Sequence, residues 1–313
     1  MSLERAIELA GAADQRAYPK PTVGAVVVAD GEVVGEGATE PGRTGRHGEL
    51  VALAVAGERA RRATLYVTME PCAHHGSTPP CTEAVLAAGI ARVVAGSLDP
   101  NPEAGGGLER LRAAGVDVEL DDRFEARRQN EAWRVWVRSG RPFVTYKVAV
   151  SLDGRVTVPG RRWVTGEESR RLVHGLRAAS DAVAVGMGTV RADQPRLDAR
   201  GVPVVRQPRR LAFGRGPLPE GSALELRPGR LEEELSMLAA ECVQSVLLEG
   251  GPSLGTAFLR AGVVDKLLLF VAPVLAGSGQ RWVDGLDEPL VPVRSSSRRV
   301  GDDAVIEAYL DEP

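Results

Sequence analysis

The feature that most constrains this chain is a set of metal-binding residue types between positions 47 and 81. His47 stands two residues before Glu49, and the pair Pro71-Cys72 is followed nine positions later by Cys81. One imidazole and two thiolates suit Zn²⁺, and three protein ligands leave the fourth tetrahedral position open to water. We therefore predict a fold that brings His47, Cys72 and Cys81 together at a zinc site.

Glu49 is predicted to act beside this metal without binding it. The order His-x-Glu, then Pro-Cys and a second Cys, is typical of zinc-dependent base deaminases. There the carboxylate takes a proton from water, passes it to a ring nitrogen and finally protonates the departing ammonia. The alternative, that these are unrelated core residues, does not explain why all four occur in this order. For His74 and His75 we favour contacts with the substrate, or hydrogen bonds to the metal-binding residues, over a role as additional metal ligands.

Charge and composition exclude several kinds of partner. A net charge of −3 and an aromatic content of 4% provide neither a basic surface nor stacking platforms for nucleic acid. We see no leader and no apolar run of membrane-spanning length, so we expect a cytoplasmic protein that does not bind membranes. Cys242 is expected to be buried beside a strand, without a catalytic role.

The first half of the chain alternates strands and helices. Asp30-Gly31 predicts a tight hairpin. The spacing predicts a three-layer α/β sandwich with the site where helix N-termini meet strand ends. The expected helices are 3–13, 47–56, 81–88 and 108–114, and the expected strands are 23–28, 32–35, 64–68, 92–96 and 116–118.

Residues 121–141 are expected to form a charged helical connector, and we place the domain boundary after Arg141, giving domains 1–141 and 142–313. The second half predicts strands at 143–150, 181–186 and 246–248, a helix at 167–179 and a surface loop at 214–230. Gly186-Met187-Gly188 lacks the third glycine of a Rossmann fingerprint. The turn Gly250-Gly251 fits either an anionic cofactor or an ordinary strand-to-helix connection.

The wide spacing of the two cysteines carries a resemblance to a known family. The stretch 70–81 resembles the bifunctional deaminase–reductase of riboflavin biosynthesis. The second half resembles the same family in order, at 147–155, 163–165, 176–178, 185–190, 249–252 and 271–275. The resemblance implies an α/β protein in which an N-terminal cytidine-deaminase-like three-layer domain is fused to a C-terminal dihydrofolate-reductase-like domain.

The resemblance also implies two consecutive reactions and their site residues. The first removes ammonia from 2,5-diamino-6-ribosylamino-4(3H)-pyrimidinone 5′-phosphate, and the second reduces the ribosyl group to ribityl with NADPH. By position, the substrate would meet Arg177, Leu197, Arg200 and Glu249. NADPH would meet Ala149, Trp163, Thr165, Thr189, Asp193, Gly251, Pro252, Ser253 and Leu254. The role of Lys147 stays open, and we expect a homo-oligomer of undetermined size.

Four residues depart from the family pattern. Lys20 stands where Asn is usual, Gly48 where Ala is usual, Arg161 where Ser is common, and Gln194 in place of a second Asp. The changes at Lys20 and Arg161 leave open a related pyrimidine or pterin of a specialised pathway as substrate. A structural zinc domain beside an active reductase is a separate alternative. Lys20 either points into the pocket, where its charge would favour an anionic group, or turns out to solvent.

Overall fold

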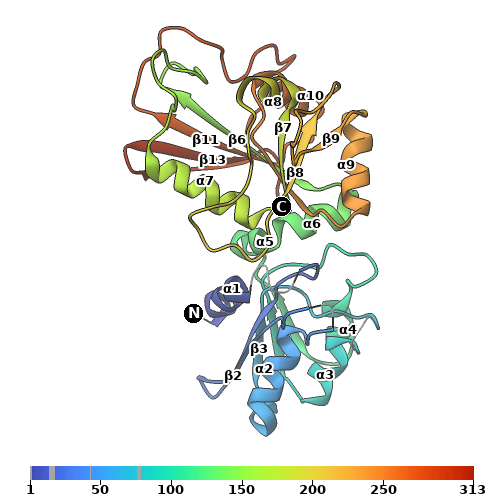
Figure 1. The fold of residues 1–313 in the computed structure, drawn as a ribbon. Coiled ribbons are helices and arrows are strands. Elements are labelled where there is room, and N and C mark those ends of the chain that lie inside the picture. Colours follow the sequence, from blue (N-terminus) through green and yellow to red (C-terminus); the bar gives the residue numbers. More distant parts are fainter. Residues whose placement is uncertain (1, 14–17, 43, 76–78) are drawn as a thin grey trace. The chain divides into compact units, whose positions relative to one another are not determined.

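The computed structural model describes residues 2–13, 18–42, 44–75 and 79–313. The chain divides into two compact units, Met1–Ser139 together with Pro313, and Gly140–Glu312 (Figure 1). Arg141 belongs to the second unit, where its guanidinium donates to both carboxylate oxygens of Asp265 at 2.8 and 2.7 Å. Each unit is built on its own sheet.

The sheet of the first unit has the strand order β2-β1-β3-β4-β5. The hairpin of β1 (Gly24–Ala29) and β2 (Glu32–Ala38) turns at Asp30 and Gly31, which both have positive φ, as a type I′ turn requires. β3 (Thr64–Val67) pairs antiparallel with β1, whereas β4 (Arg92–Ala95) and β5 (Asp117–Leu120) continue in parallel. The expected strands are confirmed to within a few residues.

Helices cover both faces of this sheet because side chains alternate along β1. Val26 and Val28 face α1 (Ser2–Ala13), while Ala25 and Val27 face α2 (Gly48–Ala56). The core on the α2 side also takes in α3 (Cys81–Ala87) and α4 (Gly107–Ala113), and the short 3-10 helix η1 (Gly57–Ala60) follows α2. The predicted three-layer sandwich is therefore confirmed.

The segment expected as a charged helical connector is helical, as predicted, but it packs within the first unit and does more than join the two units. It forms α5 (Phe124–Gln129) and α6 (Glu131–Ser139). Between them, Asn130 is buried, accepts from the Thr22 backbone N–H at 2.8 Å and donates to the Thr22 carbonyl at 2.8 Å. Trp133 of α6 packs in the main core. The many charged residues of this segment obscured the apolar side chains with which its helices pack on the first unit.

The sheet of the second unit has the order β12-β13-β11-β6-β10-β7-β8-β9. Its parallel part contains β6 (Phe143–Ser151), β7 (Ala182–Gly186), β8 (Arg209–Phe213), β9 (Glu225–Arg227), β10 (Ser245–Leu248) and β11 (Lys266–Ala272). α7 (Glu167–Ala179) and α8 (Met187–Asp193) pack on one face, and α9 (Leu231–Ala240) and α10 (Pro252–Arg260) on the other. The ends of β6, β7 and β10 thus meet at one edge.

Three details of the second unit differ from the sequence expectations. The antiparallel hairpin of β12 (Arg294–Val300) and β13 (Asp303–Tyr309) was not anticipated. The expected loop 214–230 contains β9. Cys242 is half-buried and has a φ of 63°, because it lies in the turn that closes α9 and not inside the core.

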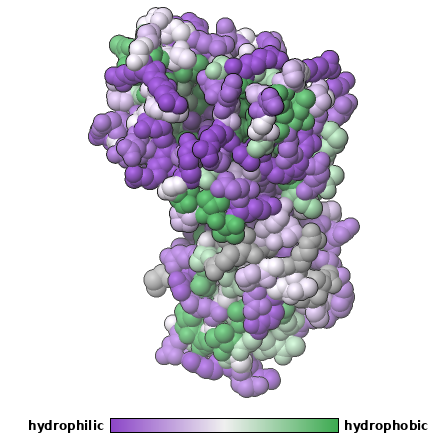
Figure 2. All heavy atoms as spheres, viewed as in Figure 1, coloured by the Kyte–Doolittle hydropathy of each residue, from purple (hydrophilic) through white to green (hydrophobic). Residues whose placement is uncertain are grey.

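In the view of Figure 2 the surface of the second unit is largely hydrophilic, whereas that of the first unit mixes hydrophilic and apolar groups. Over the described part of the chain, no helix has the length and apolar character needed to cross a membrane.

Candidate active sites

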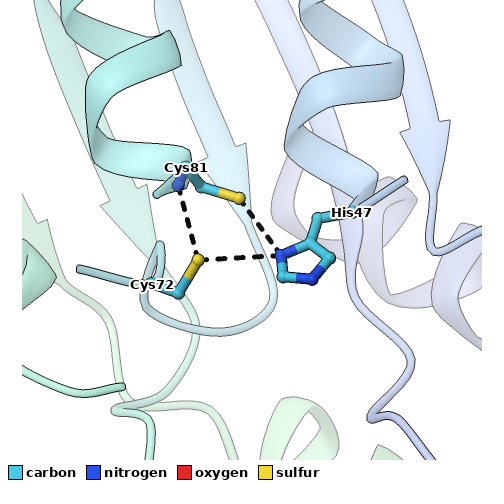
Figure 3. Close-up of side chains that lie close together, drawn as sticks. All are labelled: His47, Cys72 and Cys81. Atoms are coloured by element: carbon cyan, nitrogen blue, oxygen red, sulfur yellow. Dashed lines mark hydrogen bonds between the residues drawn. The ribbon is translucent and has the colours of Figure 1, made fainter. Parts of the chain in front are cut away.

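The three predicted zinc ligands converge in the first unit (Figure 3). His47 directly precedes α2, Cys81 opens α3, and Cys72 lies in the loop after β3. The Nδ1 of His47 lies 3.2 Å from the Cys81 sulfur and 3.7 Å from the Cys72 sulfur. Tetrahedral zinc at about 2.0–2.3 Å from each ligand would separate the ligand atoms by a little under 4 Å. The donor set therefore fits zinc.

Glu49 lies beside the cluster and keeps one oxygen free. Its side chain is buried, and Oε2 has no hydrogen-bond partner among the residues that the structure describes. Burial raises the pKa of the Glu49 carboxyl above its ordinary value. The group of possible ligands contains His47, Cys72 and Cys81 without Glu49. An orphaned buried oxygen next to a zinc-type donor set is suited to receive a proton from water.

The two loop histidines differ from each other. His74 lines the same cavity as His47, and its buried Nδ1 has no partner among the described residues. His75 is exposed, with Nε2 3.6 Å from a carboxylate oxygen of Glu83. Neither belongs to the described ligand group. Only His74 faces the cavity.

The cavity over the cluster measures about 220 Å³ and reveals residues that the sequence analysis missed. Asp99 and Asn101 line it, although their segment reads only as a loop. Glu70 holds this loop, because its carboxylate accepts from the backbone N–H groups of Asp99 at 3.2 Å and Leu108 at 2.9 Å. Burial raises the pKa of Asp99 to about 6. The fold therefore places the Asp99 carboxyl and the Asn101 amide at the wall of the cavity in which a heterocycle would bind.

Two departures from the family pattern now have a physical description. A Cβ on Gly48 would lie 2.3 Å from the Val23 carbonyl oxygen, so glycine fits a close backbone approach at this position. Lys20 lines the cavity, and its ammonium donates to the Gly45 carbonyl at 2.6 Å. The lysine thus follows the inward alternative.

In the second unit the structure joins two of the predicted substrate residues. Arg177 of α7 donates from Nε and a terminal nitrogen to the two Glu249 oxygens at 2.6 and 3.0 Å. Burial opposes ionisation of Glu249, but the hydrogen bonds from Arg177 and the charge of Lys147 outweigh it, and the pKa of Glu249 is lowered. Glu249 already occupies the fork of Arg177, which therefore serves first to hold that carboxylate.

Breaking this pair is expected to destabilise the second unit. Arg177→Met would leave Glu249 buried without its bidentate partner, at a cost of about 3–5 kcal/mol. The measurement is the urea midpoint of the unit's unfolding transition. The control Arg171→Met removes an exposed charge of the same helix, paired with Glu167 at 3.4 Å, and should shift the midpoint little. Equal shifts in the two variants would contradict this assignment.

The other predicted substrate residues surround that pair. The Asp198 carbonyl accepts from Arg177 at 3.2 Å, and the Asp198 carboxylate binds Arg200 at 2.6 Å. Leu197 is buried with a positive φ of 54°. His174, one turn before Arg177, was missed; its Nδ1 is buried and has no partner in the described chain. The position of His174 within α7 has no characteristic spacing to another site residue, so the sequence did not indicate it.

Lys147 lies on β6 toward the same face as α7. Its ammonium stands 5.5 Å from the centre of the Phe270 ring. Burial lowers the pKa of Lys147, while Glu249 acts in the opposite direction. The lysine is therefore an interior cation near Glu249, and its charge contributes to holding that carboxylate ionised.

The predicted cofactor residues are only partly in mutual contact. A Cβ on Gly251 would lie 3.5 Å from the Thr189 hydroxyl, and one on Gly186 would lie 3.4 Å from Leu254, so the ends of β7 and β10 adjoin. Gly251 caps α10, with Pro252 and Ser253 in its first turn. Ala149 is on β6 and Asp193 is exposed at the end of α8. Trp163 is half-exposed, 5.6 Å from the Arg170 guanidinium, which donates to the Thr165 carbonyl.

The remaining departures lie away from these contacts. Arg161 is exposed in the loop before α7, and Gln194 ends α8 in the left-handed region with φ 43°. Nothing in the structure explains why arginine or glutamine stands at these positions.

The two units together define a class: a zinc-dependent deaminase joined to a nucleotide-dependent reductase. Residues 1–97 match the cytidine and deoxycytidylate deaminase zinc-binding region, and residues 142–306 match the RibD C-terminal domain. The chain belongs to the RibD family of bifunctional riboflavin biosynthesis enzymes, with zinc and NADPH as cofactors.

Relatives over nearly the whole length support this assignment. The chain is 37% identical to the riboflavin biosynthesis protein RibD of Aquifex aeolicus, with 97% of this chain and 96% of that protein covered. It is 39% identical to RibD of Escherichia coli, with 89% of each covered. It superposes on Acinetobacter baumannii RibD with a TM-score of 0.82 at 32% identity, covering 98% of this chain and 97% of that one.

A Thermotoga maritima structure is similar at the same level. It is described as a diaminohydroxyphosphoribosylaminopyrimidine deaminase and 5-amino-6-(5-phosphoribosylamino)uracil reductase, and it superposes with a TM-score of 0.83 at 32% identity, covering 98% of this chain and 97% of that one. The expected fold class and the expected pair of activities are thereby confirmed.

Proposed function

We propose that residues 1–141 deaminate 2,5-diamino-6-ribosylamino-4(3H)-pyrimidinone 5′-phosphate and that residues 142–313 then reduce the product with NADPH. The observation that carries the first step is the partnerless buried oxygen of Glu49 beside the three convergent ligands. The first unit contains the residues suited to deamination and the second unit those suited to reduction, which supports assigning one reaction to each unit.

For the deaminase step, His47, Cys72 and Cys81 would hold the zinc. Bound there, zinc supplies a Lewis acid that makes water nucleophilic at neutral pH. Glu49 takes the proton released when water adds to the ring carbon that bears the amino group. It passes this proton to the adjacent ring nitrogen, and a second transfer lets the amino group leave as ammonia. Asp99, Asn101 and His74 orient the ring within the cavity.

For the reductase step, Gly251 to Leu254 and Thr189 form the side that receives NADPH, with Ala149, Trp163, Thr165 and Asp193 as further contacts. NADPH supplies a hydride for the sugar carbon that becomes the ribityl C1′. The charged group of Lys147, Arg177 and Glu249, with Arg200 and Leu197 near it, binds the phosphorylated substrate. The uncompensated positive charge of this group suits a phosphate.

We also propose that the protein is a homo-oligomer in the cytoplasm that uses small phosphorylated pyrimidines and no nucleic acid. Reduced thiols, which zinc binding requires, are maintained in the cytoplasm. The exposed edge strand β12, preceded by exposed Val291 and Val293, supports self-association, because an unpaired edge favours pairing. A solution mass equal to that of one chain would contradict the oligomer.

The deciding experiment follows both reactions on one sample of the purified protein. We expect ammonia release from the diaminopyrimidine phosphate without NADPH, and NADPH oxidation only after deamination. NADPH oxidation without prior ammonia release would reverse the proposed order. Release of no ammonia by a zinc-loaded sample would remove the deaminase assignment and leave a structural zinc unit.

Arg200→Ala is expected to raise the KM of the reductase step for the phosphorylated pyrimidine by roughly tenfold or more. Loss of a charge-assisted hydrogen bond costs about 1.5–3 kcal/mol. Arg196→Ala, which removes the other arginine that pairs with the Asp198 carboxylate, is the control and should leave the KM unchanged. An unchanged KM in the Arg200 variant would exclude this residue from the site.

A further inference from the structure

Lys20 places an ammonium group at the cavity that contains the zinc-type cluster. The residue lines this cavity together with His47, Glu49 and Cys72. Its ammonium donates to the Gly45 carbonyl at 2.6 Å. Gly45 precedes His47 by two residues, which span at most about 7 Å, so the ammonium lies on the same side of the first unit as the cluster.

This ammonium has no carboxylate partner among the residues that the structure describes. The carboxylate that acts electrostatically on Lys20 is that of Glu40. Its two oxygens accept hydrogen bonds from Arg46 at 2.7 and 3.0 Å. Glu70, also in the cavity lining, is bound by two backbone N–H groups. A lysine ammonium has three donors, and one is used here. Two donors and a full charge remain for a ligand.

Glu49, Glu70 and Asp99 also line the cavity, but none of them is bonded to the Lys20 ammonium. A half-buried cation with no bonded carboxylate is stabilised when a ligand brings a negative charge. The diaminopyrimidine ring must lie at the zinc end, and its largest charge is the 5′-phosphate. We propose that Lys20 binds the 5′-phosphate of the deaminase substrate and so sets the preference of the first unit for phosphorylated pyrimidines. This inference rests on the proposed deaminase function and adds a specificity-determining residue to it.

The test measures deaminase kcat/KM for the phosphorylated pyrimidine and for its dephosphorylated form. We expect wild type to prefer the phosphorylated form, and Lys20→Met to reduce the ratio of the two values by about 10- to 100-fold. Lys20→Arg keeps the charge and should retain most of the ratio. Using a ratio cancels effects of either variant on the loop that contains Gly45, since both substrates meet the same loop.

The matched control is Arg92→Met, which also removes one positive charge from the first unit. Arg92 opens β4 at the end of the sheet opposite the cluster, where it pairs with Asp117 and Glu119. This variant should keep the wild-type ratio, and a loss equal to that of Lys20→Met would show general electrostatic attraction instead.

Two further outcomes are distinct. Equal kcat/KM for the two substrates in wild type, or an unchanged ratio in Lys20→Met, would overturn the role of Lys20 while the deaminase function stands. Absence of deamination of either substrate by wild type would overturn the proposed function, and this inference with it. Zinc content and the melting curve of each variant establish that it is folded, and Lys20→Gln replaces Lys20→Met if the latter is not.

Discussion

Glu49→Gln is expected to lower the deaminase kcat by about 10²- to 10⁴-fold, the usual contribution of a positioned general base and acid. Glutamine has nearly the same shape but cannot accept and return a proton. Oε2 of Glu49 forms no hydrogen bond with the described residues, so the fold does not depend on this atom. The variant should therefore remain folded, keep its zinc and retain reductase activity.

The measurement combines single-turnover deamination with metal analysis of the same sample. Glu83→Gln is the matched control, because Glu83 is an exposed carboxylate at the start of α3 in the same unit. It should deaminate at the wild-type rate. Loss of zinc in Glu49→Gln would identify Glu49 as a ligand, and a kcat within a few-fold of wild type would remove it from the proton path.

The fold was predictable where burial produces a pattern. The strand β7 is apolar on both faces, one face of β6 carries Val144, Tyr146, Val148 and Val150, and Asp30-Gly31 has the backbone freedom that its hairpin needs. The strand β12 offers no such pattern, because all but its last residue are exposed and no alternation separates an inner face from an outer one. Its partner β13 pairs with β11 on the other side and alternates between buried and exposed residues over its first half.

The sites were predictable to the extent that their chemistry depends on rare residue types at fixed spacing. The zinc ligands were found because few chains place His and Cys in this order. Asp99 and Asn101 were missed, because they reach the cavity only through the conformation of their loop, which Glu70 holds in place. The link between Arg177 and Glu249 spans 72 positions and exists only once α7 packs beside the end of β10. Such contacts follow from topology.

Cys72→Ser is expected to abolish deamination by removing the metal, while the first unit stays folded but less stable. Metal ligands must be deprotonated, and a serine hydroxyl does not ionise near neutral pH. The two cysteines pack with Ala104 as a small group apart from the main core. That core is formed by side chains of β1, β3, β4 and α2 to α4, such as Val27, Leu65 and Leu111, and does not include either cysteine. Zinc would therefore be held by His47, Cys72 and Cys81 at the start of α2, in the loop after β3 and at the start of α3, outside the main core.

This argument predicts a specific pattern of results. Zinc content should fall from one to near zero per chain, deamination should become undetectable, and the first unit should melt at a lower temperature with its secondary structure retained. Reductase activity on the deaminated pyrimidine should persist, because the second unit has its own sheet and core. Cys242→Ser, the control for loss of a thiol, should keep both zinc and deamination, since Cys242 lies in the turn after α9. Full zinc occupancy in Cys72→Ser would contradict the ligand assignment, and complete unfolding of the first unit would show that the metal, and not the apolar core, determines its fold.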